Sequence, residues 1–458
     1  MKNRKYNRPV LQTVLYLLLC LLGLSSCKKY LDAKPDKKLA VPESLADAQA
    51  LLDNYAILNQ FYPATGLESD DDHYLLPEDY NSLGIEAQQV YQWDKDAANY
   101  DAWTYLYTDV LYANLSLETT ESVTVDITNE KEWKNVKGQA LFYRAFAFFQ
   151  VAEYFASPYN TSSAANTPGI PLRLTSDVNE AIARASLEQS FARITGDLKE
   201  AVQLLPVSNT PVARPAKPAA YGLLARIYLT MNDFEHAGLY ADSCLQLYNM
   251  LMDYNSIDTT AGTPFTVFNK EVIWQCNSLG SSAVYSPTAK TDSVLYNSYA
   301  GNDLRKQIFF STSADGTHSF KGGYNGARYY NFIGIATDEM YLVRAECEAR
   351  EGKLVEALSD VNTLLEKRWL TGTFVPVTAA SANDALKIIL SERRKELTFR
   401  NSRWFDLRRL NEEGKFTVTL KRDVNGAIYE LKPGDSKYTF LIPPAVIGIS
   451  GMEQNVRE

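Results

Sequence analysis

"YGLLARIYLTMNDFEHAGLYADSCLQL", residues 221–247, is the stretch that decides the fold class. It matches the tetratricopeptide pattern, in which two antiparallel helices cross closely at small residues while large residues fill the groove between them. The matching positions are Tyr221, Leu224, Ala225, Tyr228, Ala237, Ala241 and Cys244. Asn232 and Asp233 supply the turn and the N-cap of the second helix. The stretch therefore predicts a helical hairpin.

The same layout recurs in "MYLVRAECEAREGKLVEALSDVNTLLEKR", residues 340–368. Ala345 precedes Ala357 by twelve residues, which is the spacing between the corresponding alanines of the first copy. Gly352 lies between them, where the chain must turn. This stretch predicts a second hairpin of the same kind.

A third copy is split along the chain. Its first helix is expected in residues 140–155 and its second in residues 190–205, with about 44 extra residues between them. Short strands are expected at "EVIWQC", residues 271–276, and "YTFLIP", residues 438–443. Because the copies are scattered, we expect a mainly α fold: a tetratricopeptide-like helical-repeat scaffold with large loop-rich insertions and a few short strands.

The start of the chain predicts export. "MKNRKYNRP" carries four basic residues and no acid, and the apolar run from Val10 to Leu24 is shorter than the roughly 20 residues of a membrane-spanning helix. The following "LSSC" resembles the bacterial lipobox, which makes residues 1–26 a lipoprotein signal peptide and Cys27 the acylated first residue. The alternatives are a buried or transmembrane helix, and a chance cysteine after an ordinary secretory signal.

The charge of the chain excludes nucleic acid as a partner. The formal net charge of −9 becomes −13 once the four basic residues of the signal are removed. Nucleic-acid binding depends on positively charged surfaces. The remaining cysteines, Cys244, Cys276 and Cys347, are too widely spaced for a disulfide framework or a metal pair, so we interpret them as small core residues.

"SERRKELTFRNSRWFDLRRL", residues 391–410, contains six arginines and one lysine, yet its pattern indicates a structural element. One helical face is formed by Leu386, Leu390, Arg393 and Leu397. Arg393 would therefore point inward and need a partner. The candidate partners are Glu346, Glu348 and Glu396.

A second helix is expected immediately after this face. Asn401 or Ser402 can cap it. It would direct Trp404, Leu407 and Leu410 towards the core.

The chain resembles the SusD/RagB family of nutrient-binding outer-membrane lipoproteins of Bacteroidetes. The motifs that carry the resemblance, in chain order, are "CKKYLDAKP", "GQALFYRAFAFFQVAEYF", "RPAKPAAYGLLARIYL", "NKEVIWQ", "TDEMYLVRAEC", "ERRKELTFRNSRWFDLRRL" and "IPPAVI" with "EQN". One departure is Arg400-Asn401-Ser402, where family members often have Glu-Gly before the Arg-Trp pair. The resemblance implies a tetratricopeptide-like scaffold, a glycan or other nutrient as ligand, a SusC-like TonB-dependent transporter as partner, and no enzymatic activity.

Motifs of common catalytic centres are missing from the sequence. It has three histidines and contains no G-x-S-x-G elbow, H-E-x-x-H zinc motif, P-loop or G-x-G-x-x-G loop. We therefore expect no cofactor. A glycosidase needs only two positioned carboxylates, so a glycan hydrolase stays open as an alternative.

An acidic turn, "ESDDDHY", spans residues 68–74. Asp70 and Asp72 are weak candidates for binding a hard cation, because clustered carboxylates suit calcium. The turn lacks the alternating ligand spacing of an EF-hand, so a capping or solvated turn is favoured over a metal site. Acidic side chains here could also accept hydrogen bonds from sugar hydroxyls.

Tyrosines are numerous, 29 in all, and many fall in two loop-rich regions, residues 61–100 and 255–330. Aromatic rings with polar tips suit sugars, whose C–H faces stack on rings while their hydroxyls need polar partners. The candidate ligand-binding residues are His73, Tyr74, Tyr80, Trp93, Tyr285, Tyr296, Tyr299, Tyr324, Tyr329 and Tyr330. The alternative is that these side chains only pack the loops onto the helices. We interpret Trp103, Tyr107 and Asn114, at helical spacing, as core.

The sequence thus predicts a lipoprotein anchored in the outer membrane and facing the exterior, which captures an oligosaccharide or polysaccharide and delivers it to a transporter. The alternatives are a lipid-anchored glycan hydrolase and a repeat scaffold that binds only protein. Residues 27–458 are expected to form one domain, with intertwined parts at about 27–210 and 211–458.

Overall fold

The computed structural model describes residues 42–181 and 183–458. The predicted signal peptide and the predicted acylation site at Cys27 lie outside these residues. Within the described ranges no helix combines the length and the apolarity needed to cross a membrane.

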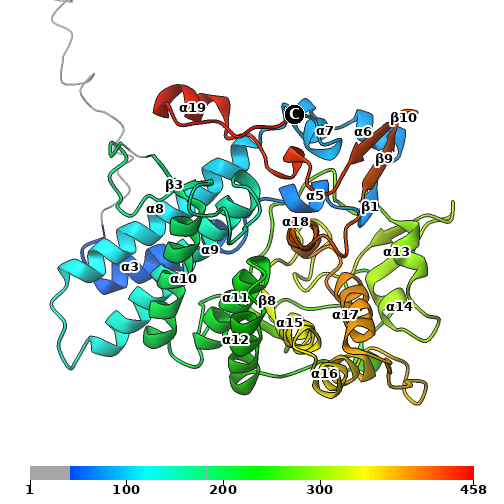
Figure 1. The fold of residues 1–458 in the computed structure, drawn as a ribbon. Helices are drawn as coiled ribbons and strands as arrows, with labels where there is room; N and C mark the ends of the chain where they lie inside the picture. Colours follow the sequence, from blue (N-terminus) through cyan, green and yellow to red (C-terminus); the bar gives the residue numbers. More distant parts are fainter. Residues whose placement is uncertain (1–41, 182) are drawn as a thin grey trace, which may run out of the picture. The chain divides into compact units, whose positions relative to one another are not determined.

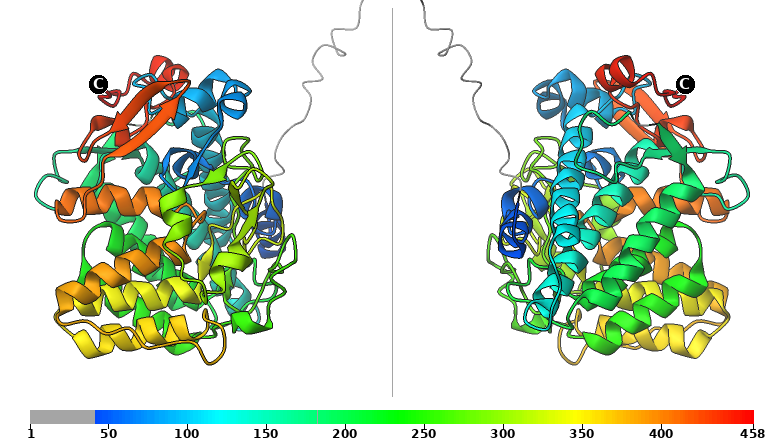
Figure 2. Two further views of the ribbon diagram at one scale, coloured as in Figure 1. Left: turned by 90° about the vertical axis from the view of Figure 1, so that its right-hand side faces the viewer. Right: turned by 90° about the vertical axis from the view of Figure 1, so that its left-hand side faces the viewer.

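All three predicted helical pairs are confirmed (Figure 1). They are α9 (Glu130–Phe155) with α10 (Leu187–Leu204), α11 (Lys217–Thr230) with α12 (Phe234–Leu247), and α15 (Thr337–Arg350) with α16 (Leu354–Glu366). The pairs pack in series, because α10 contacts α11 and α12 contacts α15. Figure 2 shows the long helices side by side, with shorter elements gathered away from them.

The turns between paired helices form as the residue types predict. Asn232 has a positive φ of 57°, and Asp233 accepts a hydrogen bond from the backbone N–H of His236 at 3.1 Å, as an N-cap residue does. Gly352 has a φ of 83°, a left-handed conformation that glycine adopts without steric cost.

Helix α9 is the centre of the core. Nearly every residue from Val136 to Phe155 is buried, as expected for a helix enclosed by others on all sides. Helices α8 (Tyr100–Ser122) and α10 flank it, and Trp274 packs edge-on against Phe142 and Phe146 with ring centroids 4.8 Å apart. The cysteines predicted to be core residues are buried and unpaired.

The remaining helices follow two patterns. Helices α3 (Leu45–Leu52), α17 (Ala382–Glu396) and α18 (Ser402–Glu413) pack on the long pairs. The short helices are α4 (Tyr55–Leu58), α5 (Thr65–Ser69), α6 (Pro77–Asn81), α7 (Ile85–Tyr91), α13 (Ser293–Asn297), α14 (Arg305–Phe309) and α19 (Pro444–Ser450).

The described strands form only two-stranded antiparallel ribbons. These are β1 (His73–Tyr74) with β5 (Lys290–Thr291), β2 (Pro168–Pro171) with β3 (Arg184–Ser186), β4 (Val272–Trp274) with β8 (Ile335–Ala336), β6 (Phe310–Thr312) with β7 (His318–Phe320), and β9 (Leu420–Val424) with β10 (Ala427–Leu431). The strand predicted within residues 271–276 is therefore confirmed as β4.

The strand predicted at residues 438–443 is wrong. Leu441 makes only a single bridge, to Ala98. The backbone N–H of Phe440 donates to Tyr154 O at 2.8 Å, at the end of α9. Because the backbone N–H groups of this segment donate to the end of a helix and to a loop, they are not free to form the hydrogen-bond ladder of a β-sheet.

Residues 391–410 form the end of α17 and most of α18, and Arg393 is buried as predicted. Its partner is Asp406, at 2.8 Å, with Glu339 at 4.0 Å. The three partners predicted from the sequence are wrong. Glu346 binds Arg409, Glu396 binds Arg305 and Arg368, and Glu348 forms no ion pair with a described residue.

The start of α18 also differs from the prediction. Asn401 occupies the N-cap position with a left-handed φ of 60° and makes no capping hydrogen bond. Its side-chain N–H donates instead to the Tyr154 hydroxyl at 2.6 Å, which joins α18 to α9. Trp404, Leu407 and Leu410 are buried as predicted.

Replacing Arg393 with alanine should destabilise the fold. Asp406 then keeps only Arg409, at 2.8 Å, so the cost should stay below the about 3–5 kcal/mol of a buried charge left with no partner. The matched control is Lys387→Ala on the same helix, whose pair with Asp384 is exposed to solvent and so contributes little to stability. Urea denaturation measures both. A stable Arg393→Ala protein that had lost only ligand binding would contradict the structural role.

Glu153 gives a second test, through pH. It lies on α9, 3.6 Å from Arg408 of α18, and burial raises the pKa of its carboxyl from 4.5 to about 7. Between these values the folded state holds a proton that the unfolded state releases, so this group stabilises the fold less as the pH rises.

Glu153→Gln removes this dependence because the amide does not titrate. Relative to the parent, the variant should gain up to about 3 kcal/mol of stability between pH 4.5 and pH 8. Urea denaturation at several pH values measures the difference, and a constant difference across this range would argue against the buried proton.

Candidate ligand-binding surface

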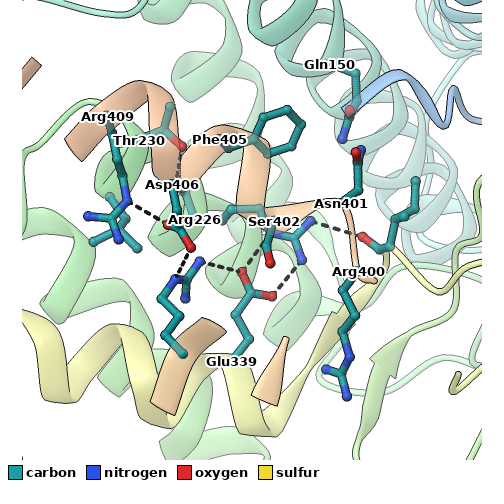
Figure 3. Close-up of a pocket in the computed structure, with 13 residues that line it drawn as sticks. Gln150, Arg226, Thr230, Glu339, Arg400, Asn401, Ser402, Phe405, Asp406 and Arg409 are labelled. Carbon is teal, nitrogen blue, oxygen red and sulfur yellow. Dashed lines mark hydrogen bonds and ion pairs between the residues drawn. The ribbon is translucent and has the colours of Figure 1, made fainter. Parts of the chain in front are cut away.

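The polar pocket between α11, α15, α17 and α18 is part of the scaffold. Figure 3 shows Arg226 with Glu339, and Arg409 with Asp406, facing one another inside it. Arg226 donates two hydrogen bonds to Glu339, at 2.8 and 2.6 Å. The free volume is about 10 Å³, which is room for a single water molecule, so the pocket cannot hold a sugar.

Three buried carboxylates, Glu271, Asp338 and Glu396, lie close enough to share an ion. Arg368 already bridges Glu271 and Glu396, at 3.0 and 2.7 Å, and Arg400 binds Asp338 at 2.7 Å. Burial raises the pKa of Glu271 to about 7, whereas at Glu396 the nearby Arg368 and Arg305 outweigh burial and lower the pKa to about 2. Arginine side chains therefore supply the positive charge in this cluster.

The acidic turn is buried, so its interpretation as a solvated turn is wrong. Asp71 forms a two-point ion pair with Arg403, at 2.6 and 2.9 Å. Asp72, one of the two cation candidates, accepts hydrogen bonds from Arg394 at 3.1 Å and Thr398 at 3.2 Å.

Asp70 and His73, also in this turn, are both buried, with Asp70 Oδ1 3.6 Å from His73 Nδ1. Burial raises the pKa of Asp70 to about 7 and lowers the pKa of His73 to about 3. His73 is therefore neutral near pH 7, and because it is buried it does not reach the surface to contact a ligand.

Four of the predicted aromatic residues also belong to the core. Tyr80 donates to Gln92 at 2.8 Å and the Trp93 indole donates to Ser69 O at 2.9 Å. The Tyr299 hydroxyl donates to Lys395 O at 2.7 Å, and the Tyr324 hydroxyl donates to the Glu271 carboxylate at 2.6 Å. Each is at most 8% exposed, so these rings pack the loops and do not form a ligand surface.

Tyr285, Tyr329 and Tyr330 are brought together at the surface. The ring of Tyr329 lies 5.5 Å from that of Tyr285 and 5.2 Å from that of Tyr330, and Tyr329 is 48% exposed. Its ring rests on the backbone of Gly280, where a Cβ would lie only 2.0 Å from the ring. We call these three residues the tyrosine cluster.

The other two candidates lie elsewhere on the loops. Tyr74 of β1 is 37% exposed. Tyr296 of α13 stacks on His318 with centroids 3.4 Å apart, beneath the ammonium group of Lys306. Neither lines a groove beside the tyrosine cluster.

Two grooves flank the tyrosine cluster. The acidic groove holds about 410 Å³ and is lined by Glu68, Glu86, Asp101, Tyr105, Ser281 and Tyr329, among others. The apolar groove holds about 810 Å³ and includes Tyr55, Tyr143, Pro211, Val267, Phe268 and Tyr330. A third hollow, of about 1000 Å³ beside α3, has no aromatic residue among its described lining.

Sequence reasoning missed several residues of these grooves. Trp103 and Tyr107 were correctly placed towards the core, and Tyr105 between them must face the opposite side of the same helix. That signal could have identified Tyr105. Nothing in the sequence marks Phe268, which is 44% exposed in a left-handed conformation with φ of 56°.

Two family models match the chain. One, described as starch-binding and associating with the outer membrane, matches residues 29–229, and the SusD family model matches residues 254–439. The SusD-like protein P2 of Formosa agariphila is 25% identical over 370 residues, which cover 67% of this chain and 71% of that protein.

Solved structures show the same fold. A SusD superfamily protein from Bacteroides vulgatus aligns with a TM-score of 0.74 at 21% identity, over 90% of this chain and 99% of its own. A SusD superfamily protein from Bacteroides thetaiotaomicron aligns with a TM-score of 0.73 at 19% identity, over 90% of this chain and 100% of its own. A protein from Bacteroides vulgatus that is provisionally described as sugar-binding aligns with a TM-score of 0.72 at 21% identity. The alignment covers 90% of this chain and 98% of that protein.

The two family matches together span most of the chain, and solved SusD superfamily structures align with nine-tenths of it. The chain belongs to the SusD family.

Proposed function

We propose that this protein is a non-catalytic glycan receptor that binds its ligand at the tyrosine cluster and passes it to a SusC-like TonB-dependent transporter. The observation that carries the proposal is the exposed ring of Tyr329, which lies against Gly280 with Tyr285 and Tyr330 beside it. A family model described as starch-binding supports a glycan as the ligand.

The cluster has the chemistry that a sugar requires. A pyranose ring presents an apolar C–H face that stacks on an aromatic ring, and Tyr329 is already held in place by its neighbours, which lowers the entropy lost on binding. Polar groups for the hydroxyls lie in the adjoining acidic groove, on Asn99, Asp101 and Ser281.

Delivery follows from location. The predicted lipid anchor at Cys27 would hold the protein at the outer membrane, facing outward, where a transporter can receive the ligand. The description of one matching family model, associating with the outer membrane, supports this placement. Closure of the protein over the transporter would then trap the bound glycan.

Tyr329→Ala should weaken glycan binding at least about tenfold, which is about 1.4 kcal/mol, because it removes the central stacking surface. The matched control is Tyr296→Ala, which removes a partly exposed tyrosine outside both grooves and should leave affinity within about twofold. Isothermal titration calorimetry on the best ligand from a glycan panel measures both. Equal affinities for the two variants would place the site elsewhere.

Gly280→Ala tests the position of the Tyr329 ring, because Gly280 is the residue against which that ring lies. The added methyl group would displace the Tyr329 ring, so binding should fall with little loss of stability, since the ring is half exposed. Thermal unfolding and calorimetry on this variant separate the two effects.

The competing hydrolase reading is decided by assaying sugar release on the same glycans. Turnover that disappears when one carboxylate is replaced would overturn the receptor proposal. If a broad glycan and peptide panel gave no binding, a scaffold that binds only protein would be favoured.

A further inference from the structure

The acidic groove has a one-sided charge distribution. Glu68, Glu86 and Asp101 line it, and none of its lining residues is a lysine, arginine or histidine. None of the three carboxylates forms an ion pair with any residue that the structure describes. Glu68, the one buried acid of the three, thus differs from buried acids such as Asp197, Asp338 and Glu346, which pair with arginines.

The three acids differ in exposure. Glu68 is buried and accepts a hydrogen bond from the Ser281 hydroxyl, and burial raises the pKa of its carboxyl. Glu86 is exposed and accepts a hydrogen bond from the backbone N–H of Tyr100 at 3.0 Å. Asp101 is exposed and accepts no hydrogen bond from a described residue. Glu86 and Asp101 therefore present negative charge to whatever occupies the groove.

Charge of one sign in a cleft repels ligands of the same sign, and the low dielectric of the cleft walls strengthens the effect. A ligand stacked on Tyr329 would place its neighbouring ring substituents in this groove, since Tyr329 is part of its wall. A carboxylate or sulfate there would meet the negative charges of Glu86 and Asp101, and no lysine or arginine lies among the described residues that line the groove.

We infer that the glycan bound at the tyrosine cluster is neutral or carries amino groups, and that uronate and sulfated glycans are rejected by Glu86 and Asp101. The inference rests on the proposed function, because it concerns the ligand of that same surface. Hydroxyl groups can donate hydrogen bonds to both carboxylates, and an ammonium group can pair with them. Glu86 and Asp101 are therefore specificity-determining residues.

The test uses the purified full chain and a panel of neutral, amine-bearing, uronate and sulfated oligosaccharides. The best neutral ligand is then compared by calorimetry with the same ligand oxidised at C6 to a carboxylate. We expect the carboxylated form to bind at least about tenfold more weakly at low ionic strength, and less so at high salt.

Glu86→Gln/Asp101→Asn should reduce that difference to within about threefold. Asp101→Asn alone should reduce the difference part of the way. This single variant keeps the hydrogen bond that the Tyr100 N–H donates to Glu86, so it serves if the double variant folds poorly. The matched control for the single variant is Glu366→Gln on α16, which also changes the net charge by one, at an exposed site outside the groove, and should leave the difference unchanged.

Tyr329-dependent binding of uronate or sulfated glycans in preference to neutral ones would overturn this inference and leave the receptor function intact. A loss on oxidation that is equal in the parent and in the double variant would also overturn it, because the penalty would not come from these charges. If no glycan in the panel bound, both the proposed receptor function and this inference would be contradicted.

Discussion

Arginines at partly or fully buried positions, paired with acids far away in the chain, fix the arrangement of this fold. Arg403 and Arg394, at the C-terminal end of the fold, bind Asp71 and Asp72 in the turn before β1. Arg422 of β9 lies over the rings of Tyr91 and Trp93, 3.7 and 4.6 Å from their centroids. It also donates hydrogen bonds to the carbonyl oxygens of Glu68, Tyr91 and Asp70. The N-terminal loops are thereby tied to the C-terminal helices.

The energetic logic of these contacts is asymmetric. Desolvating an arginine and a carboxylate costs several kcal/mol for each ion, and only close, multiply bonded geometry offsets the cost. Such pairs therefore add little net stability. An arrangement that buries an arginine without an acidic partner, however, is strongly destabilised, because the charge is left uncompensated. The loops of residues 68–93 have few long helices to position them, so the arginines select one arrangement for them.

This arrangement positions the candidate surface. Two acids of residues 68–93 reach the acidic groove. Glu68, at the start of this segment, lies in the groove wall, and so does Glu86, on α7 within the same segment. Gly280 and Ser281 approach from the other loop-rich region, where Leu279 N donates to Tyr62 O at 2.6 Å. The surface is assembled from loops that the scaffold and its ion pairs bring together, which is why its residues are scattered along the sequence.

The sequence by itself determined the individual helices, the turns of the two unsplit hairpins and the inward direction of Arg393, because these depend on spacings of three to twelve residues that local geometry converts into faces. Tertiary structure alone decided which acid each arginine binds and which tyrosines reach the surface. Asp71 and Arg403 are 332 residues apart, and no local pattern selects one distant carboxylate over another. Tyr324 and Tyr329 stand five residues apart in one loop, yet one is enclosed by Glu271 and Asp338 and the other lies on Gly280 in the open.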